Sequence, residues 1–357
     1  MAFQLANLAR LGDAPFDTII DVRAPSEFAE DHVPGAINLP VLDDEERARV
    51  GTIYKQVSPF DARKIGAALV ARNAARHIEE ALFDKPGGWR PLVYCWRGGQ
   101  RSNSFATILG QIGWRVEVLE GGYRSYRRLV AGVLHDTPLP HRLILLDGNT
   151  GTAKTELLHL LAARGVQILD LEGLAAHRGS VFGPVAHPQP AQKAFESALA
   201  QEIMRLDPSR PVVVEAESSK VGDLLVPPSL WAAMCAAPRI EVAAPLQARA
   251  EYLTRAYADL TADPEALQQT IALLVPFQGR EKVARWQEMA SRAAHVELAG
   301  ELMSDHYDPR YAKWRERQEA SWLGRVEAET LGEGALGSIA DRIADLIARK
   351  WTPAAAE

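Results

Sequence analysis

Short runs of apolar and β-branched residues recur along the first third of the chain. They cover residues 16–23, 90–94 and 113–119, and each favours one strand. Between the first two, residues 43–71 have a helical pattern that is interrupted near Ser58 and Pro59. Continuous apolar runs are typical of parallel strands covered on both faces. Their alternation with helices predicts a small doubly wound α/β domain.

A second series of strands and helices begins near residue 142. Apolar runs at residues 142–147, 166–171 and 211–219 predict strands, and residues 156–161 predict an amphipathic helix. From residue 240 onward the pattern is mostly helical. The polar, proline-containing stretch 136–141 predicts a linker. We therefore expect two α/β domains, residues 1–135 and 142–357, the second with a helical C-terminal part.

Composition narrows the class of protein without naming a function. The 357 residues, 47% hydrophobic and 24% charged, are typical of a globular protein with two domains. No apolar run approaches a membrane span and no secretory signal is visible, so we expect a cytoplasmic protein without a membrane partner. Two cysteines favour a reducing compartment. The net charge of −6 leaves RNA binding open, because local patches decide it.

Cys95 stands at the end of the strand at residues 90–94 and is followed by a glycine-containing loop. A helix is predicted from Ser102 onward, so backbone N–H groups and a helix N-terminus surround the thiol. Arg97 and Arg101 add positive charge. These features favour the thiolate, which is the reactive form of cysteine. We therefore predict a catalytic Cys95, assisted by Arg97 and Arg101, in a loop that can hold an anion.

The loop after residue 147 has the context of a phosphate-binding P-loop, because a strand precedes it and a helix follows. Lys154 supplies the positive charge, and Thr155 offers a hydroxyl to a magnesium ion. Alanine replaces the glycine expected before the lysine; we expect Ala153 to adopt ordinary helical dihedrals, with phosphate binding preserved and nucleotide turnover in doubt. The candidate binding residues are Gly148, Asn149, Thr150, Gly151, Thr152, Ala153, Lys154 and Thr155.

Further polar residues follow the next strands of the second domain. Glu172, His177 and Arg178 come after the strand at 166–171 and are candidates for substrate contact. Glu215 or Glu217, at the end of the strand at 211–219, can lie near a magnesium ion or simply be solvated. The sequence contains no cluster of cysteine and histidine with metal-ligand spacing, so no protein metal site is predicted.

Basic and aromatic residues alternate in two helical stretches of the C-terminal part, at 247–257 and 307–317. A solvated face with an aromatic edge is the favoured interpretation of the first stretch; the alternative is that it contacts phosphate or RNA bases. Cys235 has no basic neighbour and is expected to be a small core residue.

Four separated motifs in the first domain resemble the rhodanese family. They are Asp21 to Arg23, His32 to Asn38, the loop that begins at Cys95, and Glu120 to Tyr123. The resemblance implies a cysteine that carries sulfur or selenium. Asp21 and Arg23 are expected to be partners that stabilise the fold rather than catalysts.

The combination of both domains resembles the bacterial tRNA 2-selenouridine synthase family. The stretches from Cys95 to Ser102, from Gly148 to Thr155 and from Asp170 to Ser180 carry this resemblance. It implies that the wobble 2-thiouridine in the anticodon loop of Lys-, Glu- and Gln-type tRNAs becomes 2-selenouridine. The implied substrates are geranyl diphosphate, which makes an S-geranyl intermediate, and selenophosphate, supplied by a selenophosphate-producing enzyme. No tightly bound cofactor is implied, and nothing predicts an oligomeric state.

The resemblance implies that the two loops have different roles. The P-loop with Lys154 is suited to hold a diphosphate and stabilise it as it departs, which requires no nucleotide hydrolysis. Cys95 would carry the selenium or attack the modified base; the sequence does not choose. Two other interpretations remain: a sulfurtransferase whose second domain only binds a partner, and a nucleotide-dependent RNA-modifying or kinase-like enzyme.

Overall fold

The computed structural model describes residues 2–12, 14–183, 185, 187–315 and 321–351. The chain folds into two compact units. Unit 1 comprises Met1–Thr137 together with Pro190–Arg205, and unit 2 comprises Pro138–Gln189 together with Leu206–Glu357. The helix α8 (Gln192–Arg205) therefore belongs to unit 1, although the sequence on both sides of it belongs to unit 2.

Unit 1 is built on a five-stranded sheet in which all neighbours are parallel. Its order is β1 (Ala2–Phe3), β5 (Glu117–Leu119), β4 (Pro91–Tyr94), β2 (Thr18–Asp21) and β3 (Ala36–Asn38). All four residues of β4 are buried, which explains why this strand appears as an uninterrupted apolar run. The doubly wound α/β prediction for this part is confirmed.

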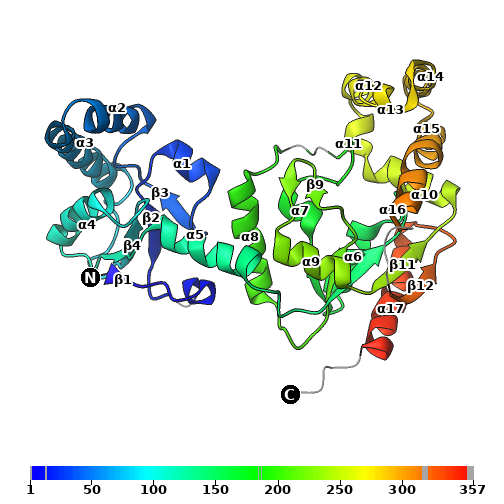
Figure 1. Ribbon diagram of the computed structural model, residues 1–357, viewed down its shortest axis with the longest axis horizontal. Coiled ribbons are helices and arrows are strands. Elements are labelled where there is room, and N and C mark those ends of the chain that lie inside the picture. Colours follow the sequence, from blue (N-terminus) through cyan, green and yellow to red (C-terminus); the bar gives the residue numbers. More distant parts are fainter. Residues whose placement is uncertain (1, 13, 184, 186, 316–320, 352–357) are drawn as a thin grey trace. The chain divides into compact units, whose positions relative to one another are not determined.

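Helices cover this sheet (Figure 1). The helices of unit 1 are η1 (Leu8–Leu11), α1 (Pro25–Glu30), α2 (Asp44–Gln56), α3 (Pro59–Glu80), α4 (Gln100–Ile112), α5 (Tyr123–Ala131), η2 (Gly132–Asp136) and α8, which packs on other helices. The expected break between α2 and α3 is present, and the Ser58 side chain caps α3 by accepting a hydrogen bond from the Asp61 amide. The helix α8 packs against α5, η1 and η2.

Unit 2 contains a second parallel sheet of five strands. Its order is β12 (Trp322–Glu327), β11 (Arg239–Ala243), β6 (Leu143–Asp147), β8 (Val212–Glu215) and β7 (Gln167–Leu169). A small antiparallel pair, β9 (Lys220–Val221) and β10 (Leu224–Leu225), follows β8. The strand β12 was not expected from the sequence, because its short run contains Gly324 and Arg325 and lies at the sheet edge.

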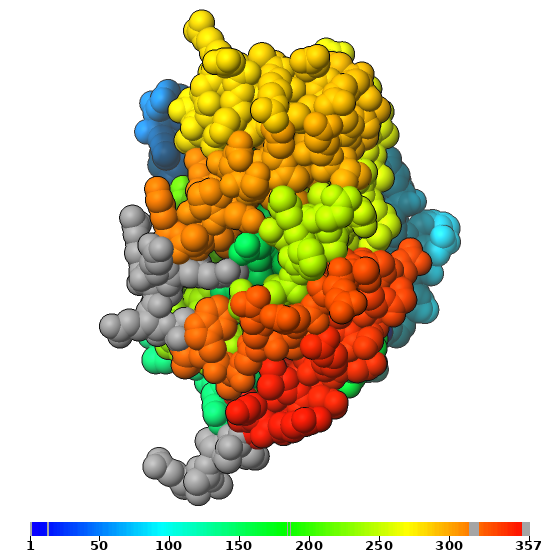
Figure 2. All heavy atoms as spheres, turned by 90° about the vertical axis from the view of Figure 1, so that its right-hand side faces the viewer, coloured from blue at the N-terminus to red at the C-terminus, as the bar shows by residue number. Residues whose placement is uncertain are grey.

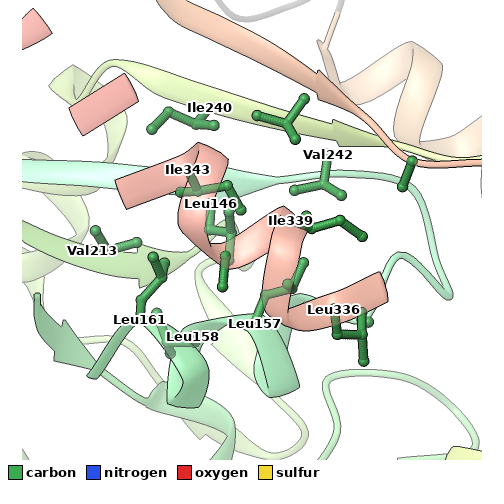
Figure 3. Close-up of a cluster of buried hydrophobic side chains, with 14 of the residues drawn as sticks. Leu146, Leu157, Leu158, Leu161, Val213, Ile240, Val242, Leu336, Ile339 and Ile343 are labelled. Carbon is green, nitrogen blue, oxygen red and sulfur yellow. The ribbon is translucent and has the colours of Figure 1, made fainter. Parts of the chain in front are cut away.

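The core of unit 2 lies where two helices pack on this sheet (Figure 3). Leu157, Leu158 and Leu161 come from α6 (Lys154–Ala162), and Leu336, Ile339 and Ile343 come from α17 (Glu333–Lys350). These six side chains are at most 3% exposed. Burying a leucine-sized side chain contributes about 1.5–3 kcal/mol, so this layer fixes the start of α6 against the sheet.

Most of the remaining helices of unit 2 lie between α10 and α16, which Figure 2 shows from yellow-green to orange. They are α7 (Leu171–Ala175), α9 (Pro228–Ala236), α10 (Leu246–Ala256), α11 (Ala258–Thr261), α12 (Pro264–Ala272), α13 (Val275–Gln278), α14 (Arg280–Ser291), α15 (His295–Leu302), η3 (Met303–Tyr307) and α16 (Asp308–Arg315). Within the described ranges, none of the helices combines the length and apolar character needed to cross a bilayer. Cys235 on α9 is exposed, so its expected core position was wrong.

Candidate functional site

Cys95 directly follows β4, and the loop that begins at this residue leads into α4, as the sequence predicted. Its side chain is 4% exposed. The Sγ atom lies 3.3 Å from the Gly99 amide nitrogen, which donates to it, and 3.2 Å from the Ser102 hydroxyl. The loop therefore places hydrogen-bond donors around the sulfur, as an anion-binding loop does.

The surroundings of Cys95 favour its ionised form. Burial by itself raises the pKa of the thiol. Hydrogen bonds from Ser102 and from the Arg97 backbone, together with the charge of Arg101, outweigh burial and lower the pKa of Cys95 below its usual value. A thiol whose pKa is lowered in this way is a better nucleophile at neutral pH than an ordinary buried cysteine.

The two arginines of the loop occupy different environments. Arg97 is exposed. Arg101 is partly buried and its NH1 donates to the Glu27 carboxylate at 3.0 Å, so part of its charge is used in an ion pair. Arg47 contacts the same carboxylate at 3.0 Å. Arg101 therefore acts on Cys95 from a fixed position, whereas Arg97 stands at the surface.

The turn from Glu120 to Tyr123 contacts the backbone of the loop that begins at Cys95. Gly122 has φ +60°, and a Cβ atom at this position would collide with the Cys95 carbonyl oxygen and the Gly98 amide. The Tyr123 amide donates to the Cys95 carbonyl at 2.8 Å, and the Tyr123 ring lies 5.4 Å from the Trp96 ring. Glycine is required here because of both the close approach and the positive φ.

Asp21 and Arg23 form a fully buried ion pair beside this turn, with 2.6 Å between Arg23 NH2 and Asp21 Oδ2. The Arg23 guanidinium also lies 3.9 Å from the centre of the Tyr123 ring and donates to the Asp31 carbonyl. The pair connects β2 to the turn below the cysteine loop. The structure shows the expected pairing of these two residues.

The P-loop of unit 2 connects β6 to α6, in the predicted context. Lys154 Nζ donates to the Gly148 carbonyl at 3.0 Å, so the loop folds around the lysine. The Thr155 hydroxyl donates to Glu172 at 2.8 Å. The free N-terminus of α6 adds positive potential at the same place.

Ala153 departs from the expected helical dihedrals. It has φ 57° and ψ 30°, which is the left-handed region, and it precedes the first residue of α6. This conformation costs an alanine roughly 1–2 kcal/mol. The Ala153 methyl is buried in the core of unit 2, where a methyl contributes about 0.8 kcal/mol. Packing therefore offsets much of the strain, which explains why alanine is tolerated where glycine is usual.

A pocket opens in front of the P-loop. Six of the candidate residues, Thr150 to Thr155, line it, together with Glu172 and Arg178. Gly148 and Asn149 are not among the lining residues; their carbonyl groups accept hydrogen bonds from Lys154 and Thr152, respectively. His177 is outside the lining residues; its ring lies against Gly183 and accepts from the Gly179 amide. The structure therefore brings Arg178, but not His177, to the pocket.

Among the residues that the structure describes, Lys154, Arg178 and Arg310 bring positive charge to this pocket. Arg178 also donates to Asp259 at 2.9 Å and lies 4.6 Å from the centre of the Tyr257 ring. Arg310 comes from α16, in the basic and aromatic stretch that the sequence placed at 307–317. Arg317, the last basic residue of that stretch, lies outside the described residues. The pocket is suited to an anionic ligand.

Glu156, Glu172 and Glu217 also line this pocket, and the carboxyl groups of Glu172 and Glu217 interact with the charge of Lys154. Burial, then the neighbouring charge of Glu172, raises the pKa of Glu217 to about 8. Burial also raises the pKa of Glu172. Gly179, at φ +66°, leaves the space that both carboxylates occupy. Glu215 is fully buried under the start of α7 instead, so Glu217 is the acid that reaches the pocket.

Some residues that organise the pocket were not named individually as site candidates from the sequence. Arg249 on α10 donates to the Thr150 carbonyl at 3.1 Å and pairs with Asp308 at 2.8 Å. Arg239 pairs with Asp147, directly before the P-loop, at 2.8 Å. Arg249 and Tyr252 are buried, so the solvated face expected for residues 247–257 was wrong. No group of three or more metal-binding side chains occurs in the part of the chain that the structure describes.

Comparisons with known proteins agree with this two-part architecture. The family model of the rhodanese-like domain matches residues 4–129, and that of the tRNA 2-selenouridine synthase AAA domain matches residues 141–278. A tRNA 2-selenouridine synthase of Nitrosomonas europaea is 35% identical over 74% of this chain and 69% of its own length. Another, of Cupriavidus pinatubonensis, is 34% identical over 85% of this chain and 90% of its own length. The chain belongs to the tRNA 2-selenouridine synthase family.

The residues matched by the two family models include both loops described above. The rhodanese match includes Cys95, and the AAA-domain match includes Lys154, Glu172 and Glu217. A solved rhodanese-related protein from Thermoplasma volcanium is 20% identical, with a TM-score of 0.23, over 36% of this chain and 90% of that chain. The fold class predicted from the sequence, a rhodanese-like domain followed by a P-loop domain, is confirmed.

Proposed function

We propose that this protein replaces the sulfur of wobble 2-thiouridine in tRNA by selenium, through an S-geranyl intermediate. The observation that carries the proposal is that one chain of this family joins a thiolate-favouring Cys95 to a phosphate-binding loop. The tRNA substrate follows from the names of the relatives. Anticodon loops of Lys-, Glu- and Gln-type tRNAs are the proposed targets, and a selenophosphate-producing enzyme is the proposed source of selenium.

The P-loop pocket is the proposed site of geranyl diphosphate. Lys154, Arg178 and Arg310 supply positive charge for a diphosphate, and the N-terminus of α6 adds to it. In the alkylation step, the sulfur of 2-thiouridine attacks C1 of the geranyl group while the C–O bond to the diphosphate breaks. The diphosphate leaves with the bonding electron pair, and the N3 proton of the base is lost to solvent. Positive charge at the departing diphosphate stabilises this transition state.

Magnesium is proposed as an ion that accompanies the diphosphate. The Thr155 hydroxyl and the Glu172 carboxylate lie 2.8 Å apart beside Lys154, and hydroxyl and carboxylate oxygens are groups that Mg²⁺ accepts. Burial raises the pKa of Glu172, and a bound cation would oppose this shift. The ion would neutralise charge on the leaving group.

Cys95 is the proposed nucleophile of the selenation step. Its thiolate attacks C2 of the base, the bond from C2 to the geranyl sulfur breaks, and the geranylthiolate takes a proton from solvent. The selenium of selenophosphate then attacks C2, the bond from C2 to the cysteine sulfur breaks and the Cys95 thiolate is restored; water cleaves the Se–P bond and releases phosphate. Each step exchanges one nucleophile for another, so no oxidant is required. Loading selenium onto the cysteine sulfur would need an oxidant, because both atoms begin fully reduced. The buried sulfur requires the loop to open toward the base.

Purified enzyme, 2-thiouridine tRNA, geranyl diphosphate and selenophosphate test the proposal, with nucleoside analysis as the measurement. Lys154→Ala is expected to slow geranylation about a hundredfold or more, because it removes a charge from the leaving-group site. Cys95→Ser is expected to geranylate normally and to form no 2-selenouridine. Sulfur transfer without geranylation would favour a sulfurtransferase, and tRNA-stimulated ATP hydrolysis would favour a nucleotide-dependent enzyme.

A further inference from the structure

An apolar pocket lies directly beside the phosphate-binding pocket in unit 2. Both are lined by Thr150 of the P-loop, by Leu253 of α10 and by Tyr257, so the two spaces share a wall. The volume of the apolar pocket that the centre of a water molecule can occupy is about 80 Å³. A single buried water needs roughly 10–15 Å³ of such volume, so the pocket has room for a group larger than several water molecules.

The wall of this pocket is predominantly apolar. Away from the P-loop it consists mainly of Leu260, Leu267, Leu298, Ala299 and Leu302, with Phe182. Its polar members are three threonines, Ser180, His295, Tyr257 and Tyr307, but polar atoms form only a small part of the exposed wall. A nucleobase carries several donors and acceptors that must be satisfied when it leaves water. This wall therefore disfavours a nucleotide and favours a ligand with a charged head and an apolar tail.

We propose that this pocket holds the alkyl chain of the prenyl diphosphate whose head binds the P-loop. The assignment rests on the proposed geranyl transfer. Ala299 on α15 has the smallest side chain among the residues from this helix that line the pocket, so it leaves room for the chain. Leu260, on α11, narrows the same pocket. These two residues determine how long a chain the pocket accepts.

The first test compares the binding of inorganic diphosphate, dimethylallyl diphosphate (five carbons) and geranyl diphosphate (ten carbons) to the full chain by calorimetry. Wild type is expected to bind the ten-carbon ligand about tenfold or more tightly than the five-carbon ligand, since each buried carbon adds affinity. Ala299→Trp fills the pocket and is expected to abolish this difference while leaving inorganic diphosphate binding intact. Ala284→Trp, at an exposed position of α14, is the matched control and should behave like wild type.

The second test is a gain of binding, which a misfolded variant cannot give. Leu260→Ala enlarges the pocket and is expected to improve binding of farnesyl diphosphate (fifteen carbons) relative to geranyl diphosphate by several-fold. If wild type prefers geranyl diphosphate but neither variant changes the preference, the pocket assignment is overturned and the proposed function stands. If folded wild type binds geranyl diphosphate no better than inorganic diphosphate, both the assignment and the proposed geranyl transfer are overturned.

Discussion

Cys95 shows how opposing effects on a single residue are balanced. Burial disfavours its charged form, whereas the donors around Sγ and the nearby Arg101 favour it. Together the donors and Arg101 outweigh burial, so the pKa of Cys95 is lowered. Hydrogen bonds to a charged group are worth about 1.5–3 kcal/mol, which corresponds to one pKa unit or more. The Ser102 hydroxyl, buried 3.2 Å from the sulfur, can donate to the thiolate, and its removal is the easiest of these changes to test.

Ser102→Ala is expected to raise the pKa of Cys95 by about one unit, because the thiolate loses a hydrogen bond. The rate at which iodoacetamide alkylates Cys95 at pH 7 should then fall several-fold, and the midpoint of the pH profile of this rate should move to higher pH. Ser104→Ala, at an exposed position of the same helix, serves as the control. An unchanged midpoint in Ser102→Ala would show that this hydroxyl does not stabilise the thiolate.

Glu217 is a residue whose charge is suppressed by its surroundings. Burial and the charge of Glu172 raise its pKa to about 8, well above the value for an exposed glutamate. The folded state then binds more protons than the unfolded state between about pH 4.5 and pH 8. Stability conferred by this difference is present at low pH and is lost as pH rises toward 8.

Glu217→Gln is expected to make unit 2 lose less stability between pH 5 and pH 8, because glutamine stays neutral throughout. One fully shifted group contributes at most about 1.4 kcal/mol per pH unit. Urea unfolding of the full chain at several pH values measures the slope, with Glu281→Gln, exposed on α14, as the matched control. Equal slopes in wild type and Glu217→Gln would contradict a raised pKa for this carboxyl.

At the scale of elements, α8 is attached to unit 1 through polar contacts. Asp31, which follows α1 and is 3% exposed, accepts hydrogen bonds from Tyr123 at 2.7 Å and from Ser197 of α8 at 2.8 Å. Arg127 of α5 pairs with Glu196 of the same helix at 2.5 Å. Since Tyr123 also supports the cysteine loop, α8 and Cys95 share one hydrogen-bonded neighbour.

Asp31→Ala is expected to loosen α8, because Tyr123 and Ser197 lose their common acceptor. Leaving such groups unsatisfied costs about 1–3 kcal/mol. Hydrogen exchange followed by mass spectrometry should show faster exchange across residues 192–205 and the Tyr123 turn. Asp84→Ala, at an exposed position of the same unit, should leave both regions as in wild type. Unchanged protection of α8 in Asp31→Ala would show that apolar packing alone holds it.

At the scale of the whole molecule, the two units are not consecutive pieces of the sequence. The chain leaves unit 2 after Gln189, contributes α8 to unit 1, and returns at Leu206. A boundary near residue 136 therefore separates the two sheets but not the complete unit 1. Phe195, Leu199 and Ile203 of α8 are at most 2% exposed, so a fragment that lacks this helix loses apolar burial as well as the polar contacts.

Fusing residues 190–205 to residues 1–137 through a flexible linker is expected to raise the melting temperature by several degrees relative to residues 1–137 alone. The reason is that the added helix restores contacts with α5, η1 and η2. Thermal unfolding followed by circular dichroism is the measurement. A fusion that carries Glu196→Ala and Ser197→Ala should show a smaller rise in melting temperature, because these side chains contact residues 1–137 directly. Identical melting temperatures with and without the helix would contradict the assignment of α8 to unit 1.

The sequence by itself determined the features that depend on neighbours along the chain. The buried strands β2, β4, β6 and β8 are continuous apolar runs, and a parallel strand covered on both faces needs such a run. The loops after β4 and β6 were placed correctly for the same reason, since each follows a clear strand and precedes a clear helix.

Tertiary structure decided what depends on distant residues. Packing against the core holds Ala153 in the left-handed conformation, and the folded loop turns His177 away from the pocket that Arg178 lines. The edge strand β12 forms because β11 offers a partner, not because its own sequence demands it. The acidic pair, the apolar pocket and the place of α8 all join segments far apart in the chain, and no local pattern encodes such contacts.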